Sequence, residues 1–99
     1  MRQQTEEAKV LAITGEHRSP DALENFRIRT ELMSQLRRLI QERGLTQTEA
    51  AKILRVSQPR VSDLVREKTD RFSIDALVTM LGLAGEEVSV VVRTRQKVA

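Results

Sequence analysis

Residues 46–66 read TQTEAAKILRVSQPRVSDLVR, and this stretch decides the fold. Thr46 and Glu49 have the spacing of a capping box, in which each side chain bonds the backbone N–H of the other residue. This pattern predicts a helix that begins after Thr46 and runs to about Leu54. The inward face of that helix is small and apolar, and it consists of Ala50 or Ala51, Ile53 and Leu54.

A corner and a second helix follow directly. The corner is residues 55–57, and Ser57 is placed to cap the next helix, with Pro59 in the first turn, where a missing N–H costs nothing. The apolar stripe that this helix would bury is Val61, Leu64 and Val65. The other faces carry Gln58, Pro59, Arg60, Ser62, Asp63 and Arg66.

A long helix is predicted before this pair. Ser19, Pro20 and Asp21 form a start signal, with a capping hydroxyl, a first-turn proline and an acid near the positive end of the helix dipole. The helix is expected to end near Arg43, before Gly44, although its N-terminal part could instead be a separate turn. Its apolar residues are Leu23, Phe26, Leu32, Met33, Leu36, Leu39 and Ile40.

A fourth helix is predicted after a charged loop at residues 68–72. Ser73 has the position of its cap, and Gly82 or Gly85 would close it. The face predicted to be buried consists of Ile74, Leu77, Val78 and Leu81.

The segment 87–95, EVSVVVRTR, is rich in valine, and β-branched residues favour a strand. Because a lone strand cannot satisfy its own backbone groups, it must pair with the N-terminal segment or with its copy in a second chain. We favour the second arrangement, a dimer. The residues expected to form the dimer contact are Val88, Val90, Val91 and Val92.

Composition bounds the class of protein. The chain has 99 residues, about one domain, and only 2% are aromatic, which favours small packed helices over a sandwich or barrel. Together with the helices predicted above, this indicates a mainly α fold of four to five helices. There is no cysteine, which excludes disulfides and thiolate metal sites, and neither a membrane span nor a signal peptide is apparent. We therefore expect a cytoplasmic protein without a metal or other cofactor. The net charge of +3 suits a polyanionic partner and an ordinary basic surface about equally.

Three parts are expected along the chain. Residues 1–18 would be an N-terminal arm or edge element, in which the single histidine, His17, is a solvated loop residue. Residues 19–86 would be the helical domain, and residues 87–99 the dimerisation strand and tail. No paired carboxylates, Cys/His set, glycine-rich phosphate loop or metal-ligand spacing stands out, so an enzyme is not expected.

Over about residues 32–83 the chain resembles the XRE family of lambda repressor/Cro-like helix-turn-helix proteins. The stretches RRLIQERGLTQTEAAKIL and SQPRVSDLVREKTDRFSIDAL, followed by the valine segment, resemble a subgroup of small regulators related to HigA-like antitoxins. The positions that carry the family pattern are Gln47, Ala51, Val56, Val61 and Leu64. The corner glycine common in this family is Arg55 here, and a left-handed backbone there would cost about 1 kcal/mol.

The resemblance implies that the helix beginning near Gln58 enters the major groove of DNA while the preceding helix braces on the backbone. The Gln58 amide suits adenine, and the Arg60 guanidinium could bind guanine or a phosphate. The residues expected to read bases are Gln58, Pro59, Arg60, Ser62 and Asp63. Those expected at the DNA backbone are Thr46, Gln47, Arg55, Ser57, Arg66, Lys68 and Arg71.

Each of these residues also has a purely structural interpretation. Thr46 and Ser57 could act only as helix caps, and Arg66 and Lys68 could form only a solvated helix end. As a set, the residues predict a sequence-specific, homodimeric transcriptional regulator, a repressor. The alternative implied by the resemblance is an antitoxin that binds and neutralises a RelE/HigB-like toxin, with or without control of its own operon.

Overall fold

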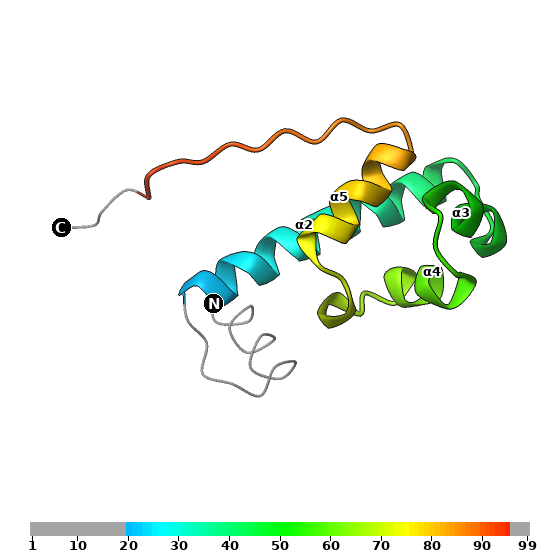
Figure 1. The fold of residues 1–99 in the computed structure, drawn as a ribbon, viewed down its shortest axis with the longest axis horizontal. Helices are drawn as coiled ribbons and strands as arrows, with labels where there is room; N and C mark the ends of the chain where they lie inside the picture. The colour runs from blue at the N-terminus through cyan, green and yellow to red at the C-terminus, as the bar shows by residue number, and fades with distance from the viewer. Residues whose placement is uncertain (1–19, 96–99) are drawn as a thin grey trace.

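The computed structural model describes residues 20–95, in which four α-helices and one 3₁₀ turn are present (Figure 1). The elements are α2 (Pro20–Glu42), α3 (Gln47–Leu54), α4 (Gln58–Val65), η1 (Thr69–Arg71) and α5 (Ile74–Leu83). The predictions made for the N-terminal arm, for His17 and for the Ser19 cap lie outside the described residues. The prediction of a mainly α fold is confirmed, and the long first helix is continuous from Pro20.

The helix starts lie where the capping residues predict them. The Thr46 hydroxyl accepts a hydrogen bond from the Glu49 N–H at 3.1 Å, and the Glu49 carboxylate accepts one from the Thr46 N–H at 2.9 Å. The Ser57 hydroxyl accepts from the Arg60 N–H at 3.3 Å, and the Ser73 hydroxyl caps α5 in the same way. Because these bonds satisfy amides that a helix leaves unpaired, the starts of α3, α4 and α5 follow from local sequence.

Residues with a left-handed backbone lie at the ends of the four helices. Gly44 follows α2 and Gly85 follows α5, with φ of 63° and 89°, and these positions suit glycine. Arg55 after α3 and Glu67 after α4 have φ of 58° and 60° without that advantage. Arg55 therefore has the left-handed backbone that the family's corner glycine would favour, at the cost expected for a non-glycine residue, while the left-handed backbone at Glu67 was not anticipated.

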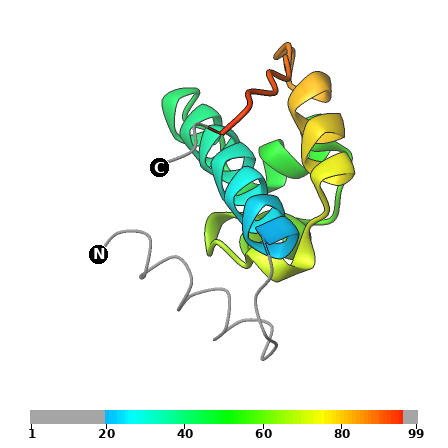
Figure 2. The same ribbon diagram turned by 90° about the vertical axis from the view of Figure 1, so that its left-hand side faces the viewer.

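The core lies where α2 and α5 pack side by side and α3 and α4 close one end (Figure 2). Ala50 is fully buried and Ala51 half-buried, so Ala50 is the member of the alanine pair that lies within the core. Val61 and Leu64 anchor α4, with exposed fractions of 0% and 1%. The buried apolar residues are Phe26, Met33, Leu36, Leu39, Ile40, Ala50, Leu54, Val61, Leu64, Phe72, Leu77, Met80, Leu81 and Ala84.

The buried face of α5 is rotated from the predicted one. Leu77 and Leu81 are buried as expected, but Met80 is buried in place of Val78, which is 36% exposed, and Ile74 is half-buried. The core follows the spacing of residues 77, 80, 81 and 84, and the rest of the apolar stripe faces away from it. Since all these residues are apolar, spacing alone did not locate the centre of the stripe.

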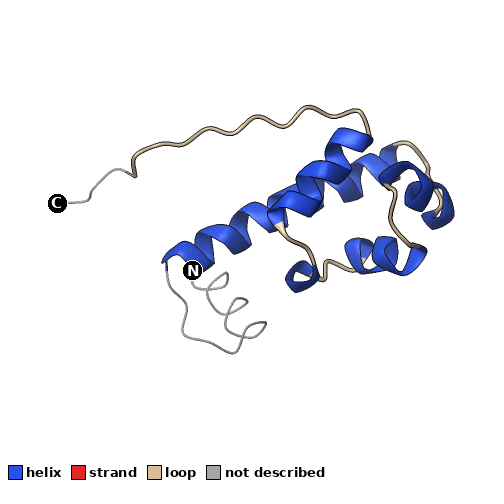
Figure 3. Ribbon diagram, in the orientation of Figure 1, coloured by secondary structure: helices blue, strands red, loops and turns tan. Residues whose placement is uncertain are grey.

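The predicted C-terminal strand is absent from the described part of the chain. Residues 86–95 run back along α2 without regular secondary structure (Figure 3), and residues 87–95 make no backbone hydrogen bond to a described residue. The C-terminal end of this segment lies near the start of α2, where the Arg95 guanidinium is 3.8 Å from the Glu24 carboxylate. The prediction of a strand is wrong for residues 20–95 of a single chain, because these residues provide no second strand for a ladder.

Among the described helices, none has the length and apolar character needed to cross a membrane. A hydrogen bond from Arg27 at 2.5 Å, together with the charges of Arg27 and Arg95, lowers the pKa of the exposed Glu24 carboxyl.

Candidate nucleic-acid interface

The outward face of α4 is an exposed polar surface on a rigidly held helix. Gln58 and Pro59 are exposed, and Ser62 is half-exposed one turn further along. Their side chains are the only ones on that face that combine exposure with the absence of a hydrogen bond or ion pair to the described residues. Since Val61 and Leu64 point the opposite way into the core, the helix presents these three side chains as one edge.

Arg60 lies on the same helix but its guanidinium is engaged. Its Cζ lies 4.2 Å from the centroid of the Phe72 ring, and its Nη1 donates to the carbonyl oxygen of Arg71 at 2.7 Å. The group therefore lies over the segment that follows α4 and bonds a main-chain acceptor there. The prediction that Arg60 reads guanine stays a prediction, but it would require the guanidinium to leave both partners.

Asp63 and Arg71, predicted to contact base and phosphate respectively, bind one another. The Arg71 Nη1 lies 3.2 Å from the Asp63 Oδ2. The Asp63 side chain is 22% exposed and that of Arg71 54%. The pair reduces the negative potential of a carboxylate on the face proposed to meet DNA, and it uses one donor of Arg71.

The residues predicted to hold the DNA backbone fall into two groups. At the start of α3, Gln47 is exposed and its side chain bonds no described residue, whereas the Thr46 hydroxyl and N–H are both used in the capping box. At the ends of α3 and α4, Arg55 and Arg66 are exposed and Lys68 is half-exposed. Ser57 belongs to neither group, because its hydroxyl caps α4.

The left-handed backbone at Arg55 should destabilise the folded state by an amount that can be measured. A left-handed backbone costs a non-glycine residue about 1–2 kcal/mol, while glycine loses about 0.5–1 kcal/mol through the freedom of the unfolded chain. Arg55→Gly is therefore expected to raise the free energy of unfolding by about 0.5–1 kcal/mol. Arg55→Ala, which removes the side chain but keeps the strain, should give no such gain in urea denaturation. A gain with alanine as large as with glycine would contradict strain as the cause.

Contacts that sequence reasoning missed hold the segment that follows α4. Arg37 on α2 binds the carboxylate of left-handed Glu67 at 2.6 Å, just after the helix ends. Arg29 on α2 donates to the Thr69 carbonyl at 2.9 Å. Phe72, predicted to lie in a charged loop, is 2% exposed. A buried aromatic in an otherwise charged loop is the one local signal that could have revealed this contact set.

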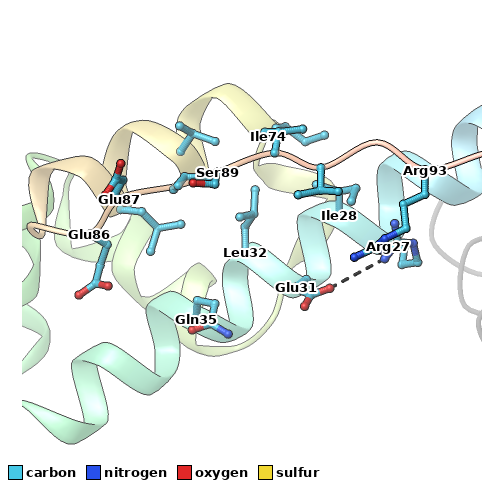
Figure 4. Close-up of a pocket in the computed structure, with 15 residues that line it drawn as sticks. Arg27, Ile28, Glu31, Leu32, Gln35, Ile74, Glu86, Glu87, Ser89 and Arg93 are labelled. Carbon is cyan, nitrogen blue, oxygen red and sulfur yellow. Dashed lines mark ion pairs between the residues drawn. The ribbon is translucent and has the colours of Figure 1, made fainter.

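A second surface of interest is the groove between α2, α5 and residues 86–93, which has a volume of 470 Å³ (Figure 4). Leu32, Ile28 and Ile74 lie along it beneath the extended segment. Of the four valines predicted to form a dimer contact, Val88 is half-buried against the core. The other three are exposed at 83%, 69% and 90%, in the order Val90, Val91 and Val92.

The described residues contain no group of three or more His, Asp or Glu side chains that could hold a metal ion. The exposed side chains of α3 and α4 and of the residues that follow them include the amides of Gln47 and Gln58 and the guanidinium groups of Arg55 and Arg66. These groups suit hydrogen bonding to base edges and phosphates.

Comparisons with known proteins agree with this arrangement. A family described as a helix-turn-helix domain matches residues 17–93 of the chain. A solved structure of a protein described as an XRE family transcriptional regulator superposes with a TM-score of 0.72 at 32% sequence identity, and the match covers 81% of this chain and 92% of that one. No match is found among curated proteins.

Proposed function

The chain belongs to the XRE family of helix-turn-helix proteins, and on this premise we propose that it is a sequence-specific DNA-binding transcriptional regulator. In this proposal it acts as a homodimer and represses transcription by occupying its operator. The observation that supports it most directly is the edge of Gln58, Pro59 and Ser62 on α4, exposed and unpaired opposite a fully buried anchor.

The proposed reading geometry puts the N-terminal end of α4 in the major groove. The Gln58 amide both donates and accepts, which matches the N6 and N7 positions of adenine. Pro59 offers an apolar surface to a thymine methyl, and the Ser62 hydroxyl is one turn further along. Asp63 could accept from cytosine only if its carboxylate is released from Arg71, so we assign it a secondary role.

The proposed backbone contacts flank this edge. Gln47 lies at the start of α3, where helix amides favour a phosphate. Arg55 and Arg66 supply exposed positive charge at the ends of the two helices, and Lys68 and Arg71 follow α4. These contacts would position the protein without carrying sequence information.

A phosphate contact by Arg66 predicts a specific salt effect. Arg66→Ala should weaken binding to all duplexes by a similar factor and reduce the slope of log K against log salt by about 0.9. Lys52→Ala serves as a control, since Lys52 is an exposed cation on α3 that is not assigned to the interface. Fluorescence anisotropy at four or more salt concentrations measures both slopes. An unchanged slope for Arg66→Ala would remove this residue from the interface.

The proposed dimer uses the extended segment at residues 87–95. Its exposed valines and unpaired backbone groups are suited to antiparallel pairing with a second copy, which would supply the neighbouring strand missing from residues 20–95. Two copies of α4 would then meet two half-sites about 34 Å apart. A single short helix offers few base contacts, so the dimer would supply most of the affinity.

A random-site selection with the full chain tests the proposed function. We expect a pool of random duplexes to become enriched in one defined inverted repeat. A folded protein that enriches no sequence at physiological salt would contradict sequence-specific binding.

The antitoxin function is a second candidate, supported by the same extended segment. Exposed valines beside unpaired backbone groups can add a strand to the sheet of another protein. A neighbouring gene that encodes a small basic RNase, together with a stable complex of the two products, would favour this candidate. Both functions can coexist in one chain if the partner adds to the edge of residues 87–95 that the second copy leaves free, while α4 stays available to DNA.

A further inference from the structure

We propose that Arg60 is a positioning residue, which fixes the recognition helix α4 against the segment at residues 69–72 instead of reading a base. This inference rests on the proposed DNA-binding function. It assigns the reading edge to Gln58, Pro59 and Ser62, and it gives Phe72 a role in DNA recognition without contact to DNA.

The local geometry uses both properties of a guanidinium group. One face of it covers the Phe72 ring at 4.2 Å from the centroid, and an N–H of Nη1 donates to the Arg71 carbonyl at 2.7 Å. Stacking on an aromatic face and directional donation can occur together in arginine because its cation is planar. Phe72 is 2% exposed within the core, so the ring under Arg60 is a fixed platform.

The segment that receives Arg60 is itself attached to the first helix. Arg29 of α2 donates to the carbonyl of Thr69, which is 5% exposed, at 2.9 Å. Arg71 in turn reaches back to Asp63 on α4. Contacts therefore run from α2 through residues 69–72 to Arg60 and Asp63 on α4, and the Arg37–Glu67 pair holds the turn after the C-terminal end of the helix.

Base reading would disrupt these contacts. To fork onto guanine, the guanidinium of Arg60 would have to leave the Phe72 ring and leave the Arg71 carbonyl without this donor. Groove reading depends on the angle at which a recognition helix is presented, and Arg60 fixes α4 within its first turn. The same residue is thus better used to set the position of Gln58 than to touch a base.

A double-mutant cycle tests the contact between Arg60 and Phe72 in the absence of DNA. Arg60→Ala and Phe72→Leu should be coupled. Arg60→Ala should raise the equilibrium constant for unfolding by a factor that is about threefold smaller in the Phe72→Leu background than in the parent. Arg66→Ala is the matched control, because Arg66 is an exposed arginine at the opposite end of α4 with no contact to Phe72, and it should show no coupling. Additive effects for Arg60 would overturn the inference.

A scan of the selected operator tests the role in recognition and needs no Phe72 variant. Arg60→Ala should weaken every base-pair variant by the same factor, about 3- to 10-fold, with the preferred bases unchanged. A relaxed preference at a single base pair would overturn the inference and establish base reading. A salt slope reduced as in Arg66→Ala would overturn it in favour of a phosphate contact. If the parent protein selects no operator, the proposed DNA-binding function is wrong. The coupling measured without DNA then still decides whether Arg60 holds α4 against Phe72.

Discussion

Removal of residues 89–99 is expected to produce a folded monomer whose affinity for the selected operator is lower by at least about 100-fold. The truncated chain keeps Val88, which packs against the core, and Glu86, whose N–H bonds the Leu81 carbonyl at the end of α5. Val90, Val91 and Val92, which it loses, are 69–90% exposed, so their removal leaves the core intact. The loss arises because one α4 helix then binds one half-site alone.

A variant of all 99 residues separates the effect of losing the dimer from the effect of shortening the chain. Val90→Asn with Val92→Asn removes two exposed valines and a favourable β-propensity, and it should dissociate the dimer in analytical ultracentrifugation. Ser89→Asn with Thr94→Asn introduces the same residues into the same segment and should perturb the dimer less. A dimer of unchanged stability in the valine variant and in the truncated chain would place the contact between copies elsewhere.

Replacement of Gln58 by alanine is expected to weaken the selected operator by about 1–3 kcal/mol and to relax the preference at one base pair in each half-site. The side chain is exposed and uncharged, so the change should leave the unfolding free energy nearly constant and the salt slope intact. Binding to a random duplex should change little, because non-specific affinity comes from the phosphates.

Gln41→Ala is the matched control, since Gln41 is an exposed glutamine near the end of α2 and no part of the proposed interface. Operators that carry each single base-pair change, titrated with the parent and both variants, give the measurement. If Gln58→Ala keeps the parent's full preference at every position, the N-terminal end of α4 does not read the operator.

Local sequence predicted the helix-turn-helix unit well because its signals are short-range. The Thr46 and Ser57 caps fixed the starts of α3 and α4, and Gly44 fixed the end of α2. The centre of the apolar stripe on α5 was misplaced, with Val78 expected inside in place of Met80. Burial there depends on the packing of α5 against α2, which apolar spacing alone does not specify.

The candidate site was predicted as a set of residue types but not as a set of contacts. Arg60, Asp63 and Arg71 were each expected to face DNA, whereas they bind Phe72, the main chain and one another. Partners up to 40 residues apart, such as Arg29 and Thr69, leave no trace in local spacing. The C-terminal strand was predicted from valine content, but a strand needs a partner, and residues 20–95 of one chain supply none.

The central claim is that two copies of α4 bind two half-sites on one face of the duplex as a single body. The most direct test is the affinity of the parent chain for its selected operator with about 5 base pairs inserted between the half-sites, which turns them to opposite faces. We predict that affinity falls by at least about 100-fold, to that of an isolated half-site. An insertion of about 10 base pairs returns the half-sites to one face, and affinity should then recover only if the dimer can span the longer distance. An affinity that is insensitive to the 5-base-pair insertion would contradict the account.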